Sequence, residues 1–591
     1  MRSLPAPIRQ IATRATATIY LQHLEKRHNV VMQSLSRYVP AWLGRYWSTF
    51  SYVGLAVATL FFALSLTPSL LPRTFLVQGI LSGFAIAIGY GIGVLLVWSW
   101  LYLEIPKPNE KLQHYSKWTT SAVVAIVAVV FLWRDTVWQN SIRSLMEMEP
   151  VTTGYPWRVA LIAVFTSIVL VAIARAIGAL WRFVDRKVQK VVPRRVAHFL
   201  SAVIVVIGLF LIANDVIGRL ALNAADATFV RLDQIVDDGI EEPADPAASG
   251  SAASLIPWDT IGRFGKQFVA AGPTKESIAK FRGQDAKRPL RVYVGLGSKE
   301  TPQERAALAL QELIRVGGFE RSVLVVATPT GTGWLDPGAV DTFEYLHGGD
   351  TAIVTMQYSY LPSWITILVD PDRSSSSATA LFNTVYDHWK KLPKDKRPKL
   401  YVHGLSLGAL GSAASADLFT VFEDPIQGGV WSGPPFPSSV WVGATRNRNP
   451  DSPMWLPVFR DSSMLRFTGR ECSLNQPGVR WGPMRFVFIQ HASDPMTFFS
   501  PDLLYQKPAW LKGERGPDVS PYLMWCPILT FLQTGFDLPM ATTVPKGYGH
   551  DFAPSSYVDA WIAVTDPPAW TADDTQRLKQ LFTDKSIKPK D

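Results

Sequence analysis

Residues 402–408 read Val402-His403-Gly404-Leu405-Ser406-Leu407-Gly408. The apolar residues at the start predict a strand, and the small residues from Gly408 to Ser415 predict a helix. Gly-x-Ser-x-Gly between a strand and a helix is typical of a nucleophile elbow, a sharp turn that exposes a serine oxygen. Glycines suit both flanking positions because side chains would clash in so tight a turn. We therefore predict that Ser406 is a nucleophile; a structural serine in a turn is the alternative.

The residues after Ser406 complete a catalytic triad in the order serine, acid, histidine, which is the order found in α/β-hydrolases. Of nine histidines, only His491 and His550 follow Ser406. Asp494 comes just after a predicted strand, 485–490, and His550 lies later in a glycine-rich loop. We predict Asp494 as the acid and His550 as the base, with His491 as a strand-end residue. Three other acids also precede His550 and stay open as alternatives: Asp502, Asp518 and Asp537.

An oxyanion hole needs two N–H groups aimed at the developing negative charge. One is expected from Leu407, the residue after the nucleophile, and the other from a loop that follows an earlier strand. That loop is 328–334. Since Pro329 has no N–H, we expect Thr330 or Gly331 to be the donor. An ordinary turn without this role is the alternative.

The first third of the chain is strongly apolar. The 591 residues exceed one ordinary domain, and the whole chain is 48% hydrophobic but only 18% charged. Apolar runs close to the ~20 residues that a helix needs to cross a bilayer lie near the start, several with tryptophan at an end. Buried core helices are the alternative for any one run. We predict five transmembrane helices, at about 52–72, 76–101, 118–138, 157–181 and 196–215.

Basic residues set the expected orientation. Segments 1–49 and 182–195 carry seven and six Lys or Arg, whereas loops 73–75 and 139–156 carry one each. Because basic loops stay in the cytoplasm, the N-terminus is expected there, and five spans place the rest outside. The net charge of +10 suits anionic lipid headgroups near the membrane. The sequence shows no nucleic-acid-binding motif, so we expect a membrane and no nucleic acid as partner.

Four regions are expected: a basic cytoplasmic segment at 1–49, a transmembrane domain at 50–217, a flexible linker at 218–256 and a hydrolase domain at 257–591. From residue 290, apolar strands alternate with helical stretches, the pattern of a mainly parallel sheet wrapped by helices. Thr301 and Glu304 form a capping-box pattern with Pro302 at the first helical position. The predicted fold is an α-helical transmembrane domain joined to an α/β-hydrolase domain with a cap.

The predicted cap consists of two irregular stretches, one on each side of Asp494. Their large aromatic residues suit a pocket for an acyl chain, although they could equally pack the cap itself. No metal-ligand cluster or cofactor motif is visible, so we expect no cofactor. Cys472 and Cys526 form either a disulfide or two free thiols. The aromatic residues are Trp441, Trp455, Trp481, Phe498, Phe499, Trp510 and Trp525.

Five strings in the sequence are distinctive: Ser65–Arg73, Ile256–Asp259, Thr328–Trp334, Gly348–Ala352 and Gln357–Trp364. They resemble a family of membrane-embedded α/β-hydrolases that is common in actinobacteria and joins an N-terminal multi-span domain to a C-terminal hydrolase domain. Members often have Glu before the nucleophile, whereas this chain has Leu405; that position takes no proton, so the triad assignment is unaffected. The resemblance implies the fold and the Ser-Asp-His triad but no substrate.

The first functional hypothesis is a membrane-anchored, extracytoplasmic serine esterase or lipase that acts on a lipid or an acylated cell-envelope ester. An acyltransferase with the same triad and an alcohol acceptor is the second hypothesis. A non-catalytic scaffold or transport-associated protein is a third, of another class; the intact Ser-Asp-His order argues against it.

Overall fold

The computed structural model describes residues 50–106, 109–212, 228–370, 372–417 and 421–587. The predicted basic segment 1–49 and the first ten residues of the predicted linker lie outside these ranges. The chain divides into two compact units. One comprises Ile86–Ala128 with the chain up to Phe62, and the other comprises Ala63–Ala85 with Val129–Asp591. The second unit therefore contains the hydrolase region together with parts of the predicted transmembrane domain.

Among the described residues of the predicted spanning region there are five apolar helices, and four of them are long and apolar enough to cross a membrane. The helix α3 is shorter, at 14 residues, so the expected span 52–72 is not one continuous helix. Prolines at 68 and 72 disfavour a helix there. The bounds are α3 Tyr52–Ser65, α4 Phe75–Tyr102, α5 Glu110–Leu145, α6 Pro156–Val188 and α7 Arg194–Leu211.

A seven-stranded sheet forms the centre of the hydrolase region in the described chain. Its order is β1-β3-β2-β4-β5-β7-β6, and every neighbouring pair is parallel. The predicted α/β-hydrolase fold is thereby confirmed. The strands are β1 Leu290–Val294, β2 Val323–Thr328, β3 Thr351–Met356, β4 Lys399–Leu405, β5 Gly428–Ser432, β6 Leu465–Thr468 and β7 Arg485–Ile489.

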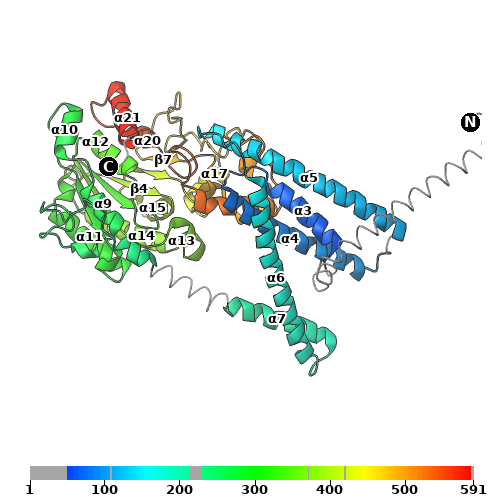
Figure 1. The fold of residues 1–591 in the computed structure, drawn as a ribbon. Coiled ribbons are helices and arrows are strands. Elements are labelled where there is room, and N and C mark those ends of the chain that lie inside the picture. The colour runs from blue at the N-terminus through cyan, green and yellow to red at the C-terminus, as the bar shows by residue number, and fades with distance from the viewer. Residues whose placement is uncertain (1–49, 107–108, 213–227, 371, 418–420, 588–591) are drawn as a thin grey trace, which may run out of the picture. The chain divides into compact units, whose positions relative to one another are not determined.

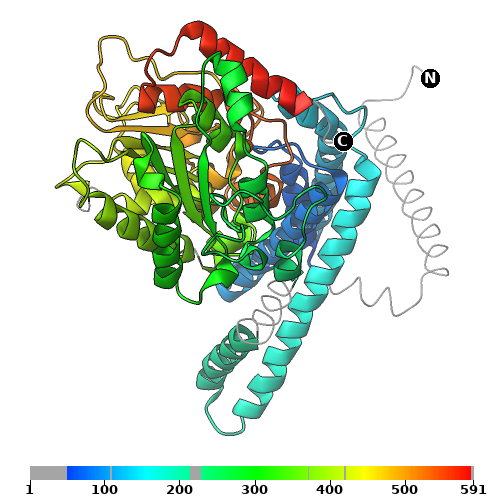
Figure 2. The same cartoon turned by 90° about the vertical axis from the view of Figure 1, so that its left-hand side faces the viewer.

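Helices pack against both faces of this sheet (Figures 1 and 2). The helices α11 (Pro302–Arg315), α14 (Asp372–Trp389) and α15 (Leu407–Ser415) pack together on one face, and α12 (Pro337–Leu346) and α20 (Pro554–Thr565) pack together on the other. The predicted capping box is present, since Thr301 Oγ1 accepts from the Glu304 N–H and the Glu304 carboxylate accepts from the Thr301 N–H. The other helices are α9 Arg263–Ala270, α10 Lys275–Arg282, α13 Ser363–Val369, α17 Ser439–Arg446, α18 Pro495–Phe498, α19 Leu529–Asp537 and α21 Ala572–Ile587.

The second half of the predicted flexible linker packs against the hydrolase region. Ser249 is fully buried, and its hydroxyl donates to the backbone carbonyl of Arg291 in β1 (3.3 Å). Ser254 donates to the Glu312 carboxylate in α11 (2.6 Å), and Ile256 is fully buried. The small residues that suggested flexibility allow close backbone approach instead. This part of 218–256 is therefore not a free linker.

Candidate active site

The turn between β4 and α15 has the geometry of a nucleophile elbow. Ser406 has φ 61° and ψ −128°, a strained backbone conformation for a residue with a side chain. A Cβ added to Gly404 would lie 2.1 Å from the Gly408 carbonyl oxygen, and one added to Gly408 would lie 2.2 Å from the Thr328 carbonyl oxygen. A side chain at either position would clash with a backbone carbonyl, so both positions require glycine. The elbow stands at the carboxyl edge of the parallel sheet, where α/β folds bind their ligands.

The predicted acid and base are in contact. His550 Nδ1 lies 2.7 Å from Asp494 Oδ2, and the two side chains are 8% and 0% exposed. Asp494 also accepts from the Met496 N–H (2.8 Å) and from the Thr497 hydroxyl (3.0 Å). These donors hold the carboxylate in one orientation, so that it can fix the imidazole tautomer with the proton on Nδ1.

The three alternative acids lie elsewhere. Asp502 accepts from the Tyr505 hydroxyl, Asp518 accepts from Ser493, and Asp537 forms an ion pair with Arg73. Among the described contacts of the imidazole of His550, the only carboxylate bonded to it is Asp494.

The strand end beside the elbow brings the serine and histidine near each other. The Ser406 N–H donates to the Ser432 carbonyl at the end of β5 (2.9 Å). The next residue, Gly433, has φ 53°, and a Cβ there would lie 2.4 Å from His550 Cε1. Ser406 Oγ and His550 Nε2 are both buried, and neither bonds to any other residue that the structure describes. Such catalytic hydrogen bonds often form only when substrate is bound.

Two residues just after β7 hold the loop that carries His550. His491 Nδ1 donates to the Gly549 carbonyl (2.9 Å), and Ser493 Oγ accepts from the Gly549 N–H (2.9 Å). Ser493 in turn donates to Asp518 Oδ2 (2.5 Å). Burial lowers the pKa of His491, so the ring is neutral and a single tautomer makes this bond. The sequence predicted His491 only as a strand-end residue; its second function as a support of the histidine loop was not foreseen.

The predicted oxyanion donors differ in their surroundings. Leu407 is the first residue of α15, where backbone N–H groups have no partner within the helix. The Thr330 N–H donates to the Trp334 carbonyl (2.9 Å), and the Gly331 N–H donates to Ser363 Oγ (3.1 Å). Both predicted backbone donors of the 328–334 loop are thus engaged here, because the loop closes on itself and on α13. The Thr330 hydroxyl is held only by a 3.3 Å contact with Thr332.

The turn between α3 and α4 packs against the histidine loop, a contact that the sequence did not predict. Leu70 and Leu71 are almost fully buried, and a Cβ added to Gly549 would lie 3.3 Å from Leu71 Cδ2. Gln533 of α19 donates to the Thr67 carbonyl of the same turn (2.9 Å). This turn is therefore part of the wall around the candidate site.

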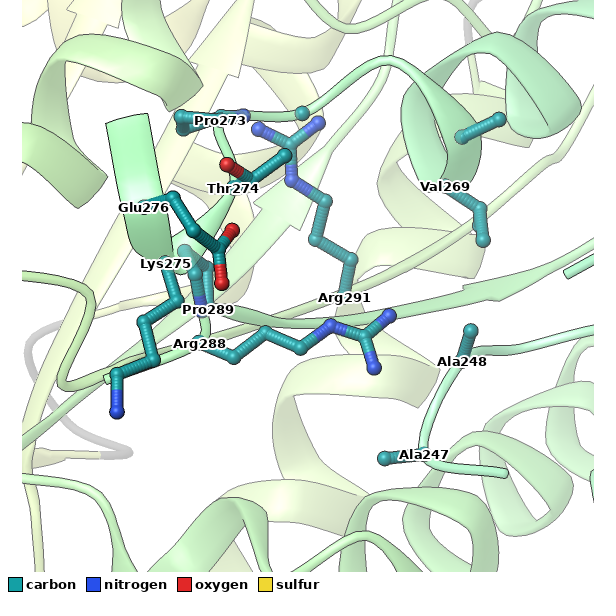
Figure 3. A pocket seen from close by; sticks show the side chains of 12 residues that line it. Ala247, Ala248, Val269, Pro273, Thr274, Lys275, Glu276, Arg288, Pro289 and Arg291 are labelled. Carbon is teal, nitrogen blue, oxygen red and sulfur yellow. The ribbon is translucent and has the colours of Figure 1, made fainter. Parts of the chain in front are cut away.

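A polar pocket of about 300 Å³ lies at the opposite edge of the sheet, where β1 begins (Figure 3). Arg288 and Arg291 line it, but Arg291 already binds Asp341 and Glu344, both at 2.6 Å. The charge of Arg291 at this pocket is thus already neutralised by two carboxylates. Within the described ranges there is no group of three or more metal-ligating side chains, and Cys472 and Cys526 are free thiols.

The parallel sheet, the elbow and the acid–histidine pair define the α/β-hydrolase fold class. Comparison with known families agrees with this class. Residues 290–578 match a family described as "Alpha/beta-hydrolase family", and residues 66–273 match one described as "Alpha/beta-hydrolase family N-terminus". The chain belongs to an α/β-hydrolase family with a two-domain layout. No curated protein matches the sequence.

Proposed function

We propose that the protein is a membrane-anchored serine hydrolase of the carboxylic-ester type. The observation that carries the proposal is the buried 2.7 Å contact between His550 and Asp494, next to a serine held in a strained turn at the carboxyl edge of the sheet. Desolvation and a fixed tautomer are what a histidine needs to act as a general base for a serine.

In the proposed reaction, Ser406 Oγ attacks the ester carbonyl and its proton passes to His550 Nε2. The negative charge on the carbonyl oxygen is met by the Leu407 N–H and by the Thr330 hydroxyl, which can turn away from Thr332. The C–O bond to the alcohol then breaks, and the alcohol leaves with the proton from His550. Water repeats the sequence on the acyl-enzyme, which releases the acid and restores the serine.

Lipid or acylated envelope esters are the proposed substrates. Four helices of membrane length, and a turn between α3 and α4 that reaches the histidine loop, favour a substrate delivered from the bilayer. We also propose that the hydrolase region is extracytoplasmic. That orientation follows from five spans, and it requires the short helix α3 to cross the membrane together with residues that flank it.

Acyl transfer is a second candidate, because the side chains of the candidate triad are at most 8% exposed. A site closed to water protects an acyl-enzyme until an alcohol acceptor arrives. Adding a primary alcohol to the assay separates the two activities, since a transferase forms the new ester and a hydrolase releases free acid.

The test is labelling of the full chain in detergent with a fluorophosphonate probe. The wild-type protein is expected to label and Ser406→Ala is not. Ser415→Ala is a matched control: this serine ends the helix that Ser406 precedes, is also buried, and donates to the Ser412 carbonyl (2.9 Å). Labelling that persists in Ser406→Ala would overturn the assignment of the nucleophile. A folded wild-type protein that neither labels nor cleaves esters would favour the scaffold.

A further inference from the structure

A cavity of about 370 Å³ lies on the acid side of the candidate triad. Its apolar wall includes the aromatic residues Phe436, Trp441, Phe498, Phe499 and Trp510. Thr497, which also lines it, donates to Asp494. Ser406, Leu407 and His550 are not among the lining residues, so the cavity is distinct from the nucleophile's surroundings.

The rim of this cavity carries an excess of positive charge. Arg446, Lys507 and Lys512 line it, are exposed, and form no ion pair or side-chain hydrogen bond with any residue in the described ranges. The one acid at the rim, Asp502, already accepts from the Tyr505 hydroxyl (2.7 Å). An aromatic wall beneath three unpaired cations complements an amphiphile with an apolar chain and an anionic head.

The cavity is also close to a helix of membrane length. The Phe499 ring is 5.3 Å from that of Phe531 in α19, and Phe536 of the same helix is 5.6 Å from Phe84 in α4. If α4 crosses a bilayer, that bilayer supplies anionic amphiphiles beside the cavity.

We infer that this cavity binds an anionic glycerophospholipid, with the acyl chain against the aromatic wall and the phosphodiester at Arg446, Lys507 and Lys512. The inference does not depend on the proposed esterase activity, because no residue of the candidate nucleophile or base contacts the cavity. The lipid-binding site lies beside the triad acid, so bound anionic lipid can change the position of the loop that carries Asp494.

The experiment measures binding of dioctanoyl phosphatidylglycerol and dioctanoyl phosphatidylcholine to the full chain in nonionic detergent. The Ser406→Ala background prevents any turnover of the probe. We expect the anionic lipid to bind about 100-fold more tightly, since each of the three basic residues contributes about 1 kcal/mol at a lipid surface and about 1.4 kcal/mol corresponds to tenfold. The preference should shrink as salt is raised, and dihexanoyl phosphatidylglycerol should bind more weakly than the dioctanoyl form.

Replacing Arg446, Lys507 and Lys512 together by glutamine should abolish the preference, whereas the exposed Lys391→Gln in the same unit should not change it. Should the triple variant fail to fold, Lys507→Arg with Lys512→Arg is expected to keep the preference. Equal binding of the two lipids by the parent protein overturns the inference without any rim variant. Displacement of the lipid by inorganic phosphate overturns it too, because the cavity would then be a simple anion site.

Discussion

Arg73 Nε lies 3.0 Å from Asp537 Oδ1, and the two side chains, 464 positions apart in the sequence, are 1% and 0% exposed. The other carboxylate oxygen accepts from the Leu70 N–H (3.2 Å), and Arg73 Nη1 donates to Gln78 (3.0 Å). Burial raises the pKa of Asp537, and the nearby guanidinium opposes that rise. The pair joins the turn between α3 and α4 to α19 at a fully buried position.

Removing Arg73 should be strongly destabilising. Arg73→Ala leaves the Asp537 carboxylate buried and uncompensated, and breaking such a pair costs about 3–5 kcal/mol. Thermal denaturation of the full chain in detergent measures this loss. Arg577→Ala, which breaks the exposed pair with Asp574, should cost less than about 1 kcal/mol. An Arg73→Ala protein as stable as the control would show that the turn is not held by this pair.

His491 is expected to support catalysis through the histidine loop. His491→Phe keeps the ring stack on Phe552 (4.6 Å between centroids) but removes the donor to the Gly549 carbonyl. Because His550 would then be poorly positioned, we expect kcat on a short-chain ester to fall about 10- to 100-fold, with KM little changed. His491→Asn, which retains an N–H donor, should recover part of the rate.

A suitable comparison is His388→Phe, at a half-buried histidine of α14 that packs on Phe319 (4.6 Å). It should leave kcat unchanged. Equal loss of rate in both variants, or a loss in His491→Phe that matches its loss of folded protein, would contradict a positioning role.

The sheet could be predicted because its strands are short apolar runs that alternate with helical stretches along the sequence. Strand β6 is harder to predict from the sequence, because its four residues, Leu465–Thr468, include Arg466, whose guanidinium donates to backbone carbonyls within the fold. The prediction of a flexible linker does not fit the packed part of 228–256, because Ala, Ser and Gly indicate flexibility in a sequence but also permit close packing of the backbone. The first span was overestimated because hydropathy averages over residues 66–72 and does not register that prolines end the helix.

Chain order alone singled out His550 as the candidate base, since it is the one histidine after Asp494. Asp494 was preferred among four aspartates because it follows a predicted strand. The contacts that support the candidate triad could not be predicted from the sequence. The bond between His491 and Gly549 joins two loops that are distant in sequence, and the contact between Leu71 and Gly549 depends on where the α3–α4 turn docks. The Thr330 N–H looked free because a sequence does not reveal that a turn closes on Trp334.

Asp336 should make stability depend on pH. It caps α12 by accepting from the Gly338 N–H (2.8 Å), and burial raises its pKa from 3.8 to about 6. Between these values the unfolded carboxyl ionises while the folded one stays protonated, so stability falls as pH rises and remains lower above pH 6. Asp336→Asn keeps the cap without the ionisation cost.

As the pH rises from 4 to 7, the free energy of unfolding of the Asp336→Asn variant should therefore increase relative to that of the wild type by up to about 3 kcal/mol, at about 1.4 kcal/mol per pKa unit. Thermal midpoints of both proteins across this range provide the measurement. Asp574→Asn should instead lower stability by an amount that hardly varies across this range, because hydrogen bonds from Thr571 lower the pKa of Asp574 from its usual 3.8. A difference that does not vary with pH would mean that Asp336 is ionised in the folded protein throughout.

Cys472 offers a direct test of orientation. It is a free, exposed thiol in the hydrolase region, and the chain has only one other cysteine, the less exposed Cys526. In a Cys526→Ser protein, a membrane-impermeant maleimide added to intact cells should label Cys472 if the hydrolase region is extracytoplasmic. Because the residue is exposed but its sulfur is partly buried, the pKa of this thiol is raised, and a pH of about 8 is preferable, where more thiolate is present.

The double variant Cys472→Ser with Cys526→Ser gives the background of the labelling. If label appears only after the membrane is permeabilised, the hydrolase region is cytoplasmic. That outcome would agree with four spans rather than five, because an even number leaves both ends of the chain on one side. The 14 residues of α3 extend about 21 Å, against about 30 Å of hydrocarbon, so its crossing needs help from flanking residues. Labelling of intact cells would show that α3 and those residues together span the membrane.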